Sequence, residues 1–159
     1  MRKRIIGQSG TAKVQHPEEQ WLDLEHIAEV EVSSEDPNFP IESALVPGRP
    51  GQGWRAAEKG AQLIRIILTT PMPVHRIRLQ FEETEAARTQ EFVLRWSDSP
   101  SAPLKEIVRQ QWTFSPEGST SEIEDYQVNL ADVAILELAL KPDLTPDNAA
   151  ASLAMLRIA

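Results

Sequence analysis

Residues 74–81 have the sequence Val-His-Arg-Ile-Arg-Leu-Gln-Phe, and this stretch decides the class of fold. Its apolar residues Ile77, Leu79 and Phe81 alternate with polar ones. Successive side chains of a β-strand point to opposite faces, so strict alternation predicts a strand with one buried face.

The same alternation recurs before and after this stretch. It is seen in residues 64–68 and 91–97, and further short candidates are 107–114, 126–130, 133–140 and 152–158. Breakers such as Pro71-Met72-Pro73 and the turn at 97–100 separate the runs. About eight strands without a long helix predict an all-β fold, an antiparallel sandwich or barrel. The residues expected to face inward are Ile64, Ile66, Leu68, Ile77, Leu79, Phe92, Leu94 and Trp96.

The first third of the chain is less regular. Residues 1–17 are polar and predict a flexible N-terminal arm, which leaves 18–159 as one β-sandwich domain. Residues 18–28 fit either a short helical face or the start of a strand. Val30 and Val32 alternate with glutamates and predict a strand, and Pro40 favours a helical turn over 40–45.

Length, composition and charge limit the class of protein. A chain of 159 residues is about the size of one domain, and without cysteine it has neither disulfides nor thiolate metal sites. The charged N-terminus lacks the apolar stretch of a signal peptide, and no run is long enough to cross a membrane, so we expect a cytoplasmic protein with no membrane partner. The net charge of −8 argues against general nucleic-acid binding, although the arginines between 76 and 109 leave a local basic face open.

No constellation in the sequence indicates catalysis or a cofactor. The three histidines share no metal-ligand spacing, and neither a nucleophile motif nor a phosphate-binding loop is present. We therefore expect no enzyme activity, no cofactor and no metal. Asp36, Asn38 and Glu42 have oxygen ligands suitable for calcium, but capping of the turn around Pro40 is the alternative role for them.

A distinctive stretch follows the glycine- and proline-rich loop 47–53. Trp54 and Arg55 end this loop, where an exposed indole would stack on a ring-shaped ligand and the guanidinium would bond its oxygens. The alternative is that Trp54 is buried and Arg55 pairs with an acid. Polar side chains elsewhere suit the same task, and the predicted ligand-binding set is Trp54, Arg55, Arg88, Gln90 and Asp98.

In the order of its segments, the chain resembles the galactose-binding-like family, also called discoidin or coagulation factor type C domains. The likeness runs from Val30 to Ile158 and includes Trp54 after the glycine-rich loop, the alternating strands and the final 151–158 segment. Residues 53–60 are also similar to the amino-terminal domain of the X-ray repair scaffold protein, and the whole pattern is similar to short bacterial proteins described as carbohydrate-binding.

The resemblance implies an eight-stranded jelly-roll sandwich whose loops at one end bind sugars, phospholipid heads or proteins. From it we expect a non-catalytic module that binds carbohydrate, with an intracellular protein-interaction or scaffold domain as the alternative. Calcium-binding members carry an acid near the last strand, where this chain has Met155, and the extracellular members often carry a disulfide.

Overall fold

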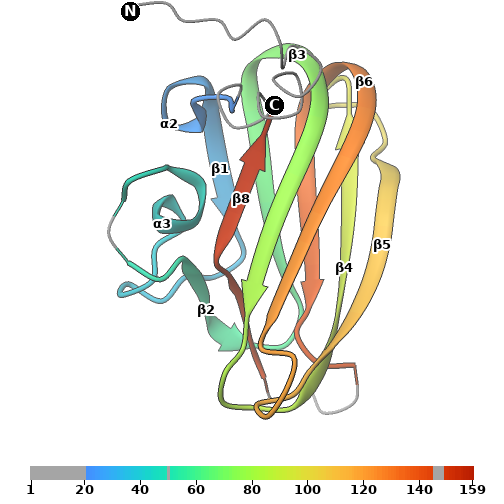
Figure 1. Ribbon diagram of the computed structural model, residues 1–159. Helices are drawn as coiled ribbons and strands as arrows, with labels where there is room; N and C mark the ends of the chain where they lie inside the picture. The colour runs from blue at the N-terminus through green and yellow to red at the C-terminus, as the bar shows by residue number, and fades with distance from the viewer. Residues whose placement is uncertain (1–20, 50, 145–148) are drawn as a thin grey trace, which may run out of the picture.

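The computed structural model describes residues 21–49, 51–144 and 149–159, which form an antiparallel β-sandwich (Figure 1). Its strands are β1 (Ala28–Val32), β2 (Trp54–Lys59), β3 (Gln62–Glu82), β4 (Arg88–Ser97), β5 (Lys105–Phe114), β6 (Ser121–Lys141), β7 (Ala150–Leu153) and β8 (Met155–Ile158). Two single-turn helices, α2 (Leu24–Ile27) and α3 (Glu42–Leu45), lie on one side. The predicted fold class is confirmed.

The long strands β3 and β6 each belong to both layers of the sandwich. The first half of β3 pairs with β1 and with the second half of β6, whereas its second half pairs with β8 and with the first half of β6. Register shifts between Ile67 and Arg76 mark the bend, and Pro71 and Pro73 lie within it because proline cannot donate to the ladder. Figure 1 shows both strands turning over at the top of the molecule. The break predicted at 71–73 is thus a bend inside one strand.

These pairings give two unequal layers. The larger layer has the order β1-β3-β6-β4-β5, and the smaller one consists of β8 beside the second half of β3 and the first half of β6. A separate ribbon of β2 and β7 lies at the lower end, where Trp54 is opposite Leu153.

The core lies between the two layers, as the alternation predicted. Seven of the eight residues expected inside are at most 4% exposed, and Trp96 is partly buried against the same core. The rings of Phe81 and Phe92 meet across the sandwich at a centroid distance of 5.3 Å. The side-chain register of these strands is therefore the predicted one.

The ambiguous segment 18–28 contains α2, which buries Leu24 and passes directly into β1. The predicted turn at 40–45 is the helix α3. The N-terminal arm predicted for residues 1–17 lies outside the described residues, so the domain limits remain a prediction. Among the described residues, no helix is long and apolar enough to cross a membrane.

Candidate ligand-binding surfaces

Trp54 is a core residue. Its side chain is 1% exposed, and its Nε1 donates a hydrogen bond to the carbonyl oxygen of Ser34 at 3.2 Å. Burial of so large an apolar ring is strongly favourable, and a ring enclosed in this way has no face left for a ligand. The predicted stacking role is corrected, and the alternative of a buried Trp54 holds.

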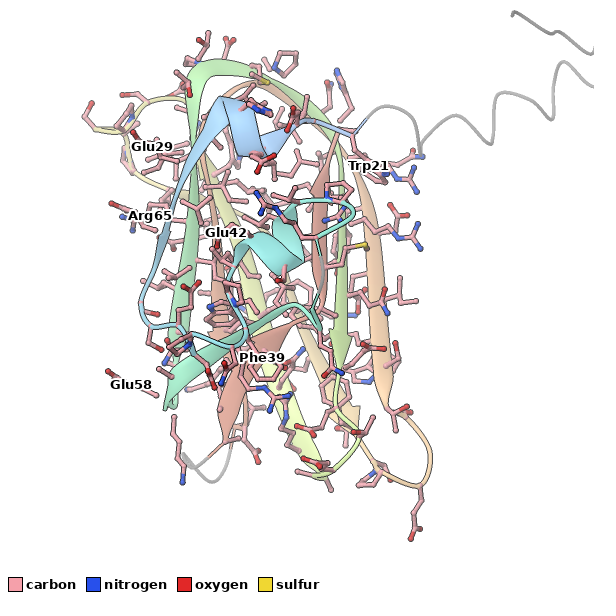
Figure 2. All side chains as sticks on the ribbon, turned by 90° about the vertical axis from the view of Figure 1, so that its left-hand side faces the viewer. Trp21, Glu29, Phe39, Glu42, Glu58 and Arg65 are labelled. Carbon is pink, nitrogen blue, oxygen red and sulfur yellow. The ribbon has the colours of Figure 1, made fainter. Side chains whose placement is uncertain are left out.

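Arg55, the next residue, is exposed and stacks on an aromatic ring. Its guanidinium carbon lies 4.6 Å from the centroid of the Phe39 ring. The backbone fixes this contact, because Asp36 N donates to Arg55 O at 2.9 Å and Arg55 N donates to Phe39 O at 3.1 Å. Within the described residues, the Arg55 side chain has neither an acidic partner nor a hydrogen bond. We refer to Arg55 with the segment 36–39 as the Arg55 platform, whose Phe39 is labelled in Figure 2.

The turn before Pro40 uses its acidic side chains as caps. Asp36 Oδ1 accepts a hydrogen bond from Asn38 N at 2.9 Å, and Glu35 Oε1 accepts one from Ile41 N at 2.7 Å. This agrees with capping rather than with calcium ligation for Asp36. Glu42 is exposed on α3, as Figure 2 shows.

A different group has the spacing of metal ligands. Among the described residues, Asp23, Glu25 and His26 place their ligand atoms within 4.8 Å of one another, and all three are exposed. The hydrogen bond to Asp23 raises the pKa of His26 and so favours the imidazolium form. A protonated imidazole is not a metal ligand, so this contact competes with metal binding.

Arg88 and Gln90 lie inside the sandwich. They are 4% and 1% exposed, because they have the same strand phase as Phe92. Arg88 donates to Glu83 at 2.7 Å, to the Pro142 carbonyl at 2.7 Å and to Gln90 at 3.2 Å. Their predicted role in contacting an external ligand is corrected, since both side chains serve a buried polar network.

The centre of that network is Glu122, which sequence reasoning missed. Its side chain is fully buried and accepts a hydrogen bond from Gln90 at 3.0 Å. Burial raises the pKa of Glu122 to about 8, and a hydrogen bond with Glu124 is the second cause of this rise. The hydrogen bond from Gln90 acts in the opposite direction and lowers the pKa. Glu124 in turn accepts a hydrogen bond from the Tyr126 hydroxyl at 3.0 Å.

The raised pKa of Glu122 favours its protonated form. Adjacent carboxyl groups that share a proton occur in acid–base catalysts, but Glu122 exposes no surface to a substrate. A signal for this residue does exist in the sequence. Glu122 and Glu124 have the same phase as Tyr126, Val128 and Leu130, which predicts that they point inward.

Asp98 lies far from Arg88. It is exposed in the turn after β4, whereas Arg88 begins that strand. Ten residues of strand at about 3.3 Å each place them roughly 30 Å apart, at opposite ends of the sandwich. The five predicted residues do not converge, and Arg88 and Gln90 are brought together only in the interior.

The outer face of the five-stranded sheet carries a hollow of about 430 Å³, which we call the sheet hollow. Its floor is a row across three strands, because Ala139 of β6 is opposite both Leu63 of β3 and Val93 of β4. Ala61 and Leu140 also line the hollow, and its polar and charged side chains are Ser33, Gln62, Glu91, Arg95, Arg109 and Lys141.

A ladder of charges borders the sheet hollow. Glu137, whose side chain is 4% exposed, accepts from Arg65 at 2.7 Å and from Arg95 at 3.3 Å on the two flanking strands. Arg65, labelled in Figure 2, also lies 3.5 Å from Glu31. Because each charge has a neighbour of opposite sign, the ladder is rigid and nearly neutral.

Comparisons with known proteins identify the architecture. No protein-family model matches the chain. A stretch is 33% identical over 81 residues to the human kinase D-interacting substrate of 220 kDa, which covers 47% of this chain but 5% of that protein.

Solved structures match over nearly the whole chain. A family 32 carbohydrate-binding module of Clostridium perfringens NanJ in complex with galactose has a TM-score of 0.63 and 12% identity, with 87% of this chain and 96% of that chain covered. A second C. perfringens module, bound to GalNAc-beta-1,3-galactose, has a TM-score of 0.64 at 15% identity, with coverages of 87% and 99%. Reduced XRCC1 bound to the DNA polymerase β catalytic domain has a TM-score of 0.60 at 13% identity, with coverages of 84% and 96%. The chain therefore has the galactose-binding-like jelly-roll fold that these carbohydrate-binding modules share with XRCC1.

Proposed function

We propose that this domain is a non-catalytic binding module that recognises a carbohydrate at the Arg55 platform. The observation that carries the proposal is the state of Arg55, which is exposed, held over Phe39 and without an acidic partner among the described residues. Among the five predicted binding residues, Arg55 is exposed and also has guanidinium N–H donors that can bind a ligand.

The geometry suits hydroxyl and ring oxygens. A guanidinium is planar and presents its donors in a fixed fork, and stacking on Phe39 fixes that fork before a ligand arrives. The turn that carries Asp36 and Asn38 lies beside it, because the backbones of Asp36 and Arg55 are hydrogen-bonded. Sugar-bound structures with the same fold support this ligand class.

The experiment is a glycan array followed by thermal-shift titration of each hit. Arg55→Ala is expected to abolish binding while the melting temperature stays within about 2 °C, because an exposed side chain contributes little to stability. Lys59→Ala, an exposed cation of the same strand, is the matched control and should bind as the wild type does. Unchanged affinity of Arg55→Ala, or an array without hits, would refute the proposal.

A second candidate function is protein interaction through the sheet hollow. It is favoured by the apolar row of Leu63, Ala139 and Val93, since Leu63 is 41% exposed there. XRCC1, which has the same fold, is seen bound to a protein. Affinity capture with wild type, Ala139→Arg and the distant control Asn129→Arg tests this function. A partner lost with Ala139→Arg alone, and rebound after purification, would support it.

A further inference from the structure

The outer face of the three-stranded sheet gathers arginines. β3 presents Arg76 and Arg78 there, and β8 presents Arg157. Arg78 lies directly opposite Arg157 on one neighbouring strand and opposite Asp125 on the other. Like charges opposite each other destabilise a sheet, so this arrangement in a chain of net charge −8 calls for an external anion.

The acids of this face, Asp125 of β6 and Glu82 at the end of β3, do not neutralise it. Arg76 binds both oxygens of Asp125, at 2.8 and 2.5 Å, and this contact lowers the pKa of Asp125. Arg78 and Asp125 attract each other electrostatically. The Nε of Arg78 is nevertheless buried without a hydrogen-bond partner among the described residues. Among the described residues of these strands, the face therefore carries three arginines, Arg76, Arg78 and Arg157, against two acids, Asp125 and Glu82.

Arg157 is held in place without a counter-charge. Its Nη1 donates to the carbonyl oxygens of Ala44 at 2.8 Å and of Leu156 at 2.9 Å, and no carboxylate contacts it within the described part of the chain. Burial lowers the pKa of Arg157, the sign of a guanidinium that has lost water without gaining an acid. A carboxylate from a binding partner would replace the hydration that the Arg157 guanidinium lost on burial.

Apolar and aromatic groups lie beside the arginines of this face. Ile123 of β6 is 55% exposed on this face, and Met155 of β8 is partly exposed two residues before Arg157. The ring of Trp21 lies 4.9 Å from the Arg76 guanidinium. Arginine, methionine and tryptophan are the residue types enriched at the centres of protein interfaces, where lysine and glutamate are depleted.

We propose that this face docks an acidic segment of a partner protein, whose carboxylates pair with Arg78 and Arg157 while its apolar groups cover Ile123 and Met155. The proposal is independent of carbohydrate binding at the Arg55 platform, which is built from β2 and the segment 36–39. Arg78 and Arg157 lie opposite each other on adjacent strands about 5 Å apart, so carboxylates on alternate residues of an extended partner, about 7 Å apart, are within reach of both long side chains.

The test measures fluorescence anisotropy of a labelled ten-residue peptide of alternating glutamate and alanine, with the glutamine–alanine peptide as its neutral control. The glutamate peptide is expected to bind saturably, and more weakly as salt rises. Arg78→Gln and Arg157→Gln should each weaken binding about tenfold or more, as loss of a charge-assisted hydrogen bond predicts. Lys105→Gln, an equal charge change at an exposed position of β5, should alter it less than twofold.

The alternatives give different results. No binding of the glutamate peptide, or equal losses in Arg78→Gln and Lys105→Gln, would overturn the proposal. Oligogalacturonate bound in place of the peptide, with the same sensitivity to Arg78→Gln, would assign the face to an acidic saccharide. Dimerisation that disappears in Arg78→Gln would assign it to a second copy of the chain. Two variants are used because Arg157→Gln frees two backbone carbonyls, whereas Arg78→Gln breaks no hydrogen bond seen within the described residues.

Discussion

The buried carboxyl of Glu122 should make the stability of this domain depend on pH between about 4.5 and 8. Its pKa is raised in the folded state, from 4.5 to about 8, so the folded chain holds a proton that the unfolded chain releases. Stability from this group is complete below about pH 4.5 and is lost as the pH rises through 8. A difference of about 3.5 pKa units sets an upper limit of about 5 kcal/mol on the loss.

Glu122→Gln isolates this effect. The amide is neutral at every pH, and it can still accept from Gln90 and donate to Glu124. The wild type should therefore lose on the order of 2–4 kcal/mol of unfolding free energy between pH 5 and pH 9 relative to the variant, which is less than the upper limit because part of the loss falls below pH 5. At pH 5 the two proteins should be about equally stable.

Urea unfolding followed by the fluorescence of the four tryptophans measures this difference at pH 5, 7 and 9. Glu82→Gln, at the exposed end of β3, controls for the change in net charge and should follow the wild type. Glu124→Gln removes the neighbouring carboxylate, which helps to raise the pKa of Glu122. This variant should therefore lose stability over a narrower pH range than the wild type does. Parallel pH profiles for wild type and Glu122→Gln would refute a buried, protonated Glu122.

Three further predictions concern the framework. Leu79→Ala should cost on the order of 2–5 kcal/mol in urea unfolding, because Leu79 is fully buried between the layers. Gly53→Ala should prevent stable folding, judged by circular dichroism, since its Cβ would lie 2.3 Å from a β7 carbonyl oxygen; Gly48→Ala, also at positive φ but with no atom within 4 Å, should cost only on the order of 1 kcal/mol. Calcium chelation should leave the melting temperature unchanged, because Met155 replaces the expected acid and Asp36 caps its own turn; a drop of several degrees would contradict this.

The architecture could be predicted because the alternation of apolar and polar residues indicates both that a segment is a strand and which of its faces is buried. Residues 64–68 and 74–81 each alternate, and their apolar members other than Ile67 are buried. Their union into one bent strand could not be predicted, since the proline pair interrupts pairing without showing whether the chain turns back or crosses to the other layer. Strand β2 was missed because residues 54–59 bury only two side chains, Trp54 and Ala56, and the strand predicted over 152–158 is divided between β7 and β8.

The binding residues were harder to predict because residue type was weighed without strand phase. Arg88 and Gln90 are polar, but they precede Phe92 and Leu94 in the same phase, and this phase buries them. Asp98 is exposed as a turn residue should be, but the length of β4 separates it from Arg88. Convergence of residues from different loops depends on which end of the sandwich each loop occupies, and composition does not contain that information.

Phase alone separates the arginines into those that can meet a ligand and those that cannot. Arg55 lies between buried Trp54 and Ala56 and is therefore exposed, and Arg78 lies between buried Ile77 and Leu79 and faces outward. A guanidinium in the outward phase keeps its donors at the surface unless an acid on a neighbouring strand takes them, as Glu137 does for Arg65 and Arg95. The arginines for which the described structure provides no such acid carry the proposals for carbohydrate at Arg55 and for an acidic segment at Arg78 and Arg157. Recognition by this domain is therefore expected to be lost by removing single guanidinium groups, at little cost to the fold.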